Sequence, residues 1–139
     1  MWGLITHHSV DDSSPLLTYT GPWLDTPAND TLAANYTDGS LRTTSTPGAK
    51  VTLQFNGTGV WFFGGHRPNY GSYVLLVDGS TVGTGSARSA TPSIPQANQP
   101  LIGSANLTMG PHTAVLMSAG GGPMDLDYAV FQTALKEGG

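Results

Sequence analysis

The clearest structural signal in this chain is KVTLQFNGTGVWFFGGHRPNYGSYVLLVDG, residues 50–79. Apolar and polar residues alternate over 51–55, and the chain is predicted to reverse at Asn56-Gly57-Thr58-Gly59. An aromatic run follows at 60–63, and alternation returns over 73–77 before Asp78-Gly79. Period-two alternation bounded by Asn-Gly and Asp-Gly is typical of antiparallel sheet. The segment therefore predicts three antiparallel strands.

Short strands separated by turns are also expected on both sides of this segment. They are predicted at 4–10, 16–20, 81–85, 101–109, 113–118 and 124–133. Residues 26–46 and 86–100 lack periodicity and are expected to be mostly loop, and 119–123 reads as a flexible break. Eight or nine short strands with almost no helix predict an all-β fold, an antiparallel β-sandwich.

Length and composition favour one domain with a core over about 5–133 and a tail or linker at 134–139. The chain has 139 residues, 19 Gly, 10 Pro and only 10% charged residues, which suits strands and turns rather than helical bundles or disorder. A net charge of −4 with five Lys and Arg argues against nucleic-acid binding. No apolar stretch approaches the roughly 20 residues of a membrane span.

The chain has no cysteine, so its compartment is inferred from glycosylation sequons instead. Four Asn-x-Ser/Thr sequons are more than a Thr- and Ser-rich chain of this length would hold by chance, and two lie at predicted turns. They predict a glycoprotein that is secreted or exposed on the cell surface. The predicted acceptors are Asn29, Asn35, Asn56 and Asn106.

An ordered series of short motifs carries a family resemblance over about residues 5–133. The series is Val10-Asp11-Asp12, Tyr19, Gly21-Pro22-Trp23, Phe55-Asn56-Gly57-Thr58-Gly59-Val60, Phe63-Gly64, Val77-Asp78-Gly79, Gly110-Pro111-His112-Thr113 and Leu126-Asp127-Tyr128. It resembles the galactose-binding-like jelly-roll domains of fungal, especially basidiomycete, surface proteins, and is more distantly similar to carbohydrate-binding modules. The resemblance implies a jelly-roll sandwich, whose members bind sugar, lipid or protein or are purely structural.

The loop at 64–73 is the leading candidate for ligand binding. A sugar site needs an aromatic platform for the C–H face of the ring and directional polar groups for the hydroxyls. Tyr70 or Trp61 would supply the platform, and His66, Arg67 and Asn69 the hydrogen bonds. The alternative is an ordinary strand connection, with Arg67 stacked on a neighbouring ring and Trp61 in the core.

Two further aromatic residues are weaker candidates. Trp23 follows a Gly-Pro break near the expected rim, where it is either a stacking platform or a packed side chain. Tyr36 lies inside a sequon in a polar segment and is expected to be exposed.

Four aspartates suggest a structural calcium site. The first and last strands of a jelly roll often pair, which would bring Asp11 and Asp12 close to Asp125 and Asp127, and carboxylates are ligands that Ca²⁺ prefers. Related carbohydrate-binding modules often carry a calcium near their termini. The alternative is an Asx turn at Asp11-Asp12 and a solvent-facing Asp125. The histidines lack the spacing of a zinc site.

No catalytic motif is present. The chain lacks a Gly-x-Ser-x-Gly elbow and phosphate-binding glycine patterns, and its single Glu, Glu137, lies in the tail. The sequence predicts a non-catalytic, lectin-like domain that binds glycans or cell-wall polysaccharide through rim loops, with micromolar to millimolar affinity. The alternative is a structural or adhesive ectodomain that self-associates as a homo-oligomer or binds a protein.

Overall fold

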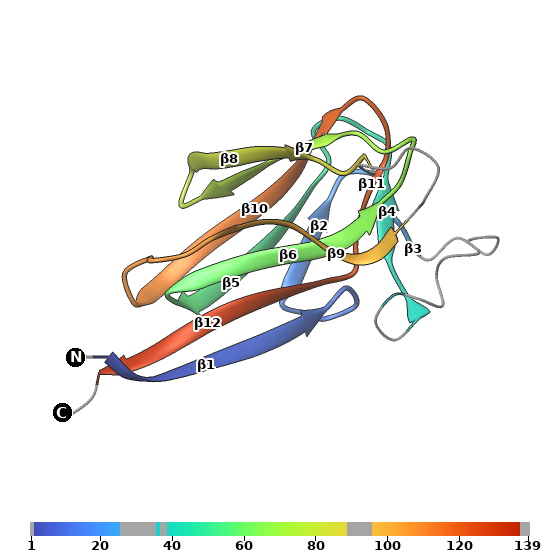
Figure 1. Cartoon of the computed structure of the whole chain (residues 1–139). Helices are drawn as coiled ribbons and strands as arrows, with labels where there is room; N and C mark the ends of the chain where they lie inside the picture. The colour runs from blue at the N-terminus through green and yellow to red at the C-terminus, as the bar shows by residue number, and fades with distance from the viewer. Residues whose placement is uncertain (1, 26–35, 37–38, 89–95, 137–139) are drawn as a thin grey trace.

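The computed structural model describes residues 2–25, 36, 39–88 and 96–136. Two antiparallel sheets face each other, and a small third sheet lies at the end of the sandwich opposite the two termini (Figure 1). None of the described residues forms a helix long and apolar enough to cross a membrane. The predicted antiparallel β-sandwich is confirmed.

The three sheets combine strands that are distant in the sequence. The four-stranded sheet has the order β1 (Trp2–Asp11), β12 (Tyr128–Lys136), β6 (Gly59–His66), β9 (Gln96–Ser104). The five-stranded sheet has the order β2 (Leu17–Thr20), β5 (Lys50–Gly57), β10 (Gly110–Gly120), β7 (Ser72–Val77), β8 (Ser80–Ser86). The small sheet has the order β11 (Met124–Leu126), β4 (Arg42–Thr44), β3 (Leu24–Asp25).

The core lies between the two large sheets and follows from the alternation in the sequence. Leu53 of β5 and Leu75 of β7 point inward from the five-stranded sheet, and Val60 and Phe62 of β6 meet them from the four-stranded sheet. All four side chains are fully buried. Each contributes roughly 1.5–3 kcal/mol by removing apolar surface from water. The alternation also turns every second residue of β6 outward.

The pairing of the three central strands differs from the prediction. Asn56-Gly57 does not close a hairpin: β5 pairs with β2 and β10, whereas β6 pairs with β12 and β9. Neither Asn56 nor Gly57 has the positive φ that a two-residue type I′ hairpin requires. The chain instead crosses between sheets here. The Asp78-Gly79 prediction is confirmed, since both residues have positive φ (53° and 84°) and join β7 to β8.

Several predicted boundaries also move. Strand β9 begins at Gln96, inside the segment expected to be loop, and the strand predicted at 124–133 is divided at Asp127 into β11 and β12. Strand β12 continues to Lys136, so part of the expected tail is strand paired with β1. Residues 26–35, 37–38 and 89–95 of the expected loops lie outside the described residues.

The expected flexible break at 119–123 is held by close backbone packing. The N–H of Gly71 donates to the carbonyl of Pro123 at 2.9 Å. A Cβ atom on Gly122 would overlap the carbonyl oxygen of Asn69. The glycines therefore let two loops lie against each other at the rim, which a larger residue would prevent.

Candidate functional site

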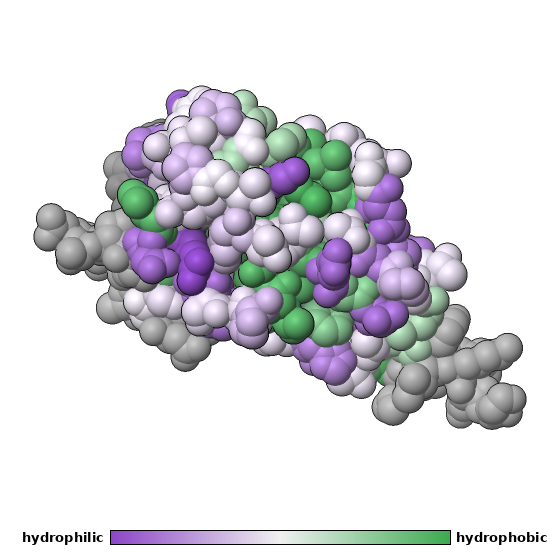
Figure 2. Space-filling view, turned by 180° about the vertical axis from the view of Figure 1, so that it is seen from behind, coloured by the Kyte–Doolittle hydropathy of each residue, from purple (hydrophilic) through white to green (hydrophobic). Residues whose placement is uncertain are grey.

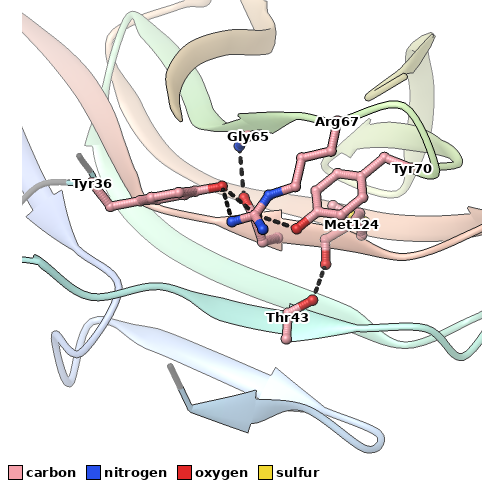
Figure 3. Close-up of polar contacts among 7 residues, drawn as sticks. Tyr36, Thr43, Gly65, Arg67, Tyr70 and Met124 are labelled. Carbon is pink, nitrogen blue, oxygen red and sulfur yellow. Dashed lines mark hydrogen bonds and ion pairs between the residues drawn. The ribbon is translucent and has the colours of Figure 1, made fainter. Parts of the chain in front are cut away.

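A buried carboxylate organises the rim loop that the sequence singled out. Asp125, in β11, is fully buried, and its Oδ2 accepts hydrogen bonds from the hydroxyls of Tyr36 and Tyr70, each at 2.5 Å (Figure 3). Its Oδ1 accepts the N–H of Gly65 at 2.6 Å. Nη2 of Arg67 lies 3.8 Å from the carboxylate and donates to the Tyr36 hydroxyl at 3.0 Å. The alternative in which Asp125 faces solvent is thereby corrected.

The two tyrosines are consequently structural. Tyr70 is 5% exposed and Tyr36 is 3% exposed, so neither ring offers a stacking face to a ligand. The predicted platform role of Tyr70 and the predicted exposure of Tyr36 are therefore wrong. The physical reason is that a buried carboxylate needs donors, and the two hydroxyls satisfy it. Burial raises the pKa of both tyrosines, which keeps both hydroxyls protonated as donors. Burial also raises the pKa of Asp125.

The remaining predicted rim residues differ in their accessibility. The Arg67 guanidinium lies 5.5 Å from the Tyr36 ring centroid and 5.4 Å from that of Tyr70, which fits the stacked alternative. His66 is half-buried, and burial lowers its pKa, so the imidazole is neutral at pH 7. Asn69 is exposed. Thus Asn69, and part of His66, keep the access that a ligand contact requires.

Gly64-Gly65 is the one local sequence feature that belongs to this cluster, although it does not identify the other residues. A Cβ on Gly65 would overlap the Tyr36 hydroxyl, and one on Gly64 would lie 2.5 Å from the backbone oxygen of Asp125. The glycine pair at the end of β6 therefore exists because β11 approaches closely. The sequence alone does not explain these two glycines, because the reason for them is the position of Asp125 on β11.

Trp23 is a packed side chain, as the second of its two predicted roles stated. Its ring meets the Tyr19 ring edge-on at 5.0 Å, and its indole N–H donates to the carbonyl of Thr20 at 3.2 Å. It is half-buried against the core cluster. The side chain is fixed beside Tyr19 and is a poor candidate for a ligand platform.

The four aspartates of the predicted calcium site do not converge. Strands β1 and β12 do pair as expected, and the N–H of Asp12 donates to the carbonyl of Asp127 at 3.1 Å. However, Oδ1 of Asp12 accepts the Ser40 hydroxyl at 2.7 Å, and Asp125 is bonded in the rim cluster. In the part of the chain that the structure describes, no three His, Asp or Glu side chains form a set that could hold a metal ion. Burial raises the pKa of Asp12 to about 6.

The outward face of the four-stranded sheet carries the aromatic surface that the rim lacks. Trp61 of β6 is half-buried on this face, with Gly59 two residues before it and Gly103 opposite it on β9. A Cβ on Gly103 would overlap Cδ1 of the indole, and one on Gly59 would lie 2.6 Å from Cη2. Both ends of the ring system thus lie on glycine backbone. The indole therefore lies along the sheet with one face turned outward.

Other side chains extend this surface along the strands. Phe63 and Tyr128 are cross-strand neighbours whose rings stack with centroids 4.6 Å apart and planes at 4°. The His7 ring of the edge strand lies 6.1 Å from the indole. The interval from Phe63 to Trp61 is two residues, about 6.6 Å along an extended strand. We call Trp61, Phe63, Tyr128 and His7 the aromatic face.

Two predicted glycosylation sites lie within the described residues, and both are exposed. Asn56 lies at the end of β5, and Asn106 follows β9 with a φ of 62°. Exposure is what a glycan acceptor requires. Asn29 and Asn35 lie outside the described residues.

Sequence comparison connects the chain to a carbohydrate-active enzyme. No family model matches the chain. It is 28% identical over 129 residues to the protein described as A type blood alpha-D-galactosamine galactosaminidase of Flavonifractor plautii. The match covers 93% of this chain but only 11% of that protein.

Solved structures share the fold at low sequence identity. One is the CBM36-1 domain of a multidomain xylanase from the hindgut metagenome of Trinervitermes trinervoides, with a TM-score of 0.57, 18% identity, and coverage of 96% of this chain and 100% of that one. Another is a two-domain esterase active on acetylated mannans, co-crystallized with mannopentaose, with a TM-score of 0.69, 15% identity, and coverage of 92% and 37%. At these identities the likeness establishes the fold, a β-sandwich like that of a carbohydrate-binding module.

Proposed function

We propose that this domain binds carbohydrate without catalysing a reaction, and that the aromatic face of the four-stranded sheet is its contact surface. The observation that carries the proposal is the Trp61 indole lying along Gly59 and Gly103. A flat ring with one open side matches the apolar C–H face of a sugar, and the polar groups around it can bond the hydroxyls. Because both positions beneath the indole are glycine, the ring can lie flat against the sheet.

The comparisons support the proposal at the level of ligand class. The sequence relative is described as a galactosaminidase, and one structural neighbour is a carbohydrate-binding domain of a xylanase. This chain corresponds to 11% of the first protein and to 37% of the mannan esterase. We therefore propose that it serves as an accessory domain that places a larger protein on its glycan.

The surroundings of Trp61 support a non-catalytic role. Glycoside hydrolysis uses a pair of carboxylates on either side of the scissile bond. The indole is bordered by Gly59, Gly103, Val130 and His7, none of which is an acid. Asp125 is fully buried beneath two tyrosines. The secretory location is part of the same proposal, supported by the exposed sequon residue Asn56.

Binding to a panel of oligosaccharides tests the proposal. Trp61→Ala removes the platform and is expected to weaken binding at least about tenfold, which corresponds to about 1.4 kcal/mol. Gly103→Ala keeps the indole but lifts it off the sheet, so it should weaken binding in the same direction. Ser104→Ala, on the next position of β9, is the matched control and should bind like the wild type. Equal binding by wild type and Trp61→Ala would refute this site.

A second candidate function rests on the opposite sheet. Apolar side chains lie among polar ones on the outer face of the five-stranded sheet (Figure 2). Val115 and Met117 of β10 lie opposite Leu76 and Val74 of β7, and all four are half-buried. Such a patch favours association with another protein surface. A mass that rises with concentration, and falls on Met117→Glu, would support this adhesive function.

A further inference from the structure

A surface pocket of about 310 Å³ adjoins the aromatic face and is lined by none of the residues predicted to bind a ligand or a metal. It is lined by Ile5, Thr58, Asn106, Leu107, Gln132 and Ala134. Resting on the proposed function, we infer that this pocket holds the terminal N-acetylated amino sugar of a glycan whose next residue stacks on Trp61. The site thereby recognises a chain end of neutral charge.

The register makes the pocket and the platform continuous. Gln132 of β12 lies directly opposite Gly59, over which the Cη2 end of the Trp61 indole lies. Ile5 and Ala134 are the next cross-strand pair on the same face. From Trp61 to the level of Gln132 is two residues of strand, about 6.6 Å. Neighbouring sugar units of one chain can therefore contact both at once.

One side of the pocket offers amide groups. Nε2 of Gln132 donates one hydrogen bond to the Thr58 hydroxyl at 3.0 Å, which orients this side chain. The amide carries a second N–H and a carbonyl that can face a ligand. Asn106 adds a second, exposed amide. Amide carbonyls and N–H groups complement the acetamido group of the sugar as well as its hydroxyls.

The other side of the pocket is apolar. Ile5 is 56% exposed on an edge strand, and Leu107 and Ala134 lie beside it in the lining. A plain hexose carries a hydroxyl where the amino sugar carries its acetamido group, and the methyl of that acetamido group would cover this wall. Burial of one methyl favours the N-acetylated sugar by about fivefold. None of the six lining residues is charged, so a uronic or sialic acid gains no ion pair here.

Asn106 is also a predicted glycan acceptor, and its attached glycan would fill the same pocket. The first experiment therefore uses protein from a bacterial host that adds no N-glycan. Calorimetric titration compares glycans ending in N-acetylgalactosamine or N-acetylglucosamine with the same glycans ending in galactose or glucose. We expect the wild type to prefer the N-acetylated end by about fivefold.

The variants distinguish failure of this inference from failure of the proposed function. Ile5→Thr keeps strand geometry but removes apolar surface, so it should reduce the preference for the N-acetylated sugar to within about twofold. Val82→Thr is the matched control, because Val82 is 47% exposed on β8, which belongs to the other large sheet, and does not line the pocket. Trp61→Ala should weaken binding of both sugars. Melting temperatures confirm that each variant is folded.

Each remaining outcome refutes one or both of the two proposals. The inference is overturned if the wild type binds both sugar types equally, or if Ile5→Thr keeps the preference. The proposed function still stands in either case if binding depends on Trp61. A folded wild type that binds no glycan overturns both. Rim-loop variants that abolish binding while Trp61→Ala does not would move the site away from the aromatic face and the pocket together.

Discussion

Removing one buried hydroxyl is expected to weaken the fold while leaving glycan binding intact. Tyr70→Phe deletes the donor that lies 2.5 Å from Oδ2 of Asp125, in a site where both groups are buried. A hydrogen bond to a charged group contributes about 1.5–3 kcal/mol. Because Tyr36 and the N–H of Gly65 still serve the carboxylate, the expected loss is about 2 kcal/mol. For a domain of this size that lowers the melting temperature by roughly 6–10 °C.

Urea unfolding followed by tryptophan fluorescence measures this loss directly. The matched control is Tyr128→Phe, which removes a hydroxyl from a half-buried ring on the outer sheet face and should change the unfolding free energy by less than about 0.5 kcal/mol. Tyr70→Phe should bind glycans like the wild type well below its melting temperature, because Tyr70 is buried away from the aromatic face. Loss of binding by Tyr70→Phe without loss of stability would refute the reasoning, because the rim loop would then contact the ligand as the sequence suggested.

Two further predictions concern pH. Burial raises the pKa of Asp12 from its ordinary 3.8 to about 6, so the folded state holds its proton more tightly and stability falls as pH rises through that window. The unfolding free energy should therefore fall by at most about 3 kcal/mol between pH 4 and pH 7, and Asp12→Asn should remove this fall. Urea unfolding of both proteins at the two pH values measures it, and an unchanged fall in Asp12→Asn would contradict the assignment to Asp12. His112 Nδ1 lies 2.6 Å from Oδ2 of Asp78, and this hydrogen bond raises the pKa of His112 and lowers that of Asp78. The stabilisation is lost as pH rises through the raised pKa of His112 or falls through the lowered pKa of Asp78, and Asp78→Asn should return the NMR-titrated His112 pKa toward its usual value.

The elements that could be predicted are those with local causes. The alternation of Val51, Leu53 and Phe55 identifies β5 because a half-buried strand exposes every second side chain. Asp78-Gly79 identifies the β7–β8 turn because both positions need positive φ. Trp61, one of the two predicted candidate platforms, lies on the outward face of β6, because Val60 and Phe62 on either side of it point into the core.

The sites that could not be predicted depend on strands that are far apart in the sequence. Asp125 reaches Tyr36 across 89 positions and Tyr70 across 55, so no local pattern distinguishes a buried acid from a solvent-facing one. The flat placement of Trp61 depends on Gly103, which is opposite it only because β9 pairs with β6. A glycine in a strand has this meaning only when its cross-strand neighbour is known.

The sequence by itself determined that this chain forms short antiparallel strands with a core of alternating side chains and no extended basic or membrane-spanning segment. The tertiary structure alone decided which strands pair, and so that Asn56-Gly57 crosses between sheets rather than closing a hairpin. It also decided that the rim tyrosines serve a buried carboxylate while Trp61 faces outward. The physical reason is that alternation fixes which residues share a face, whereas long-range pairing fixes what each face meets.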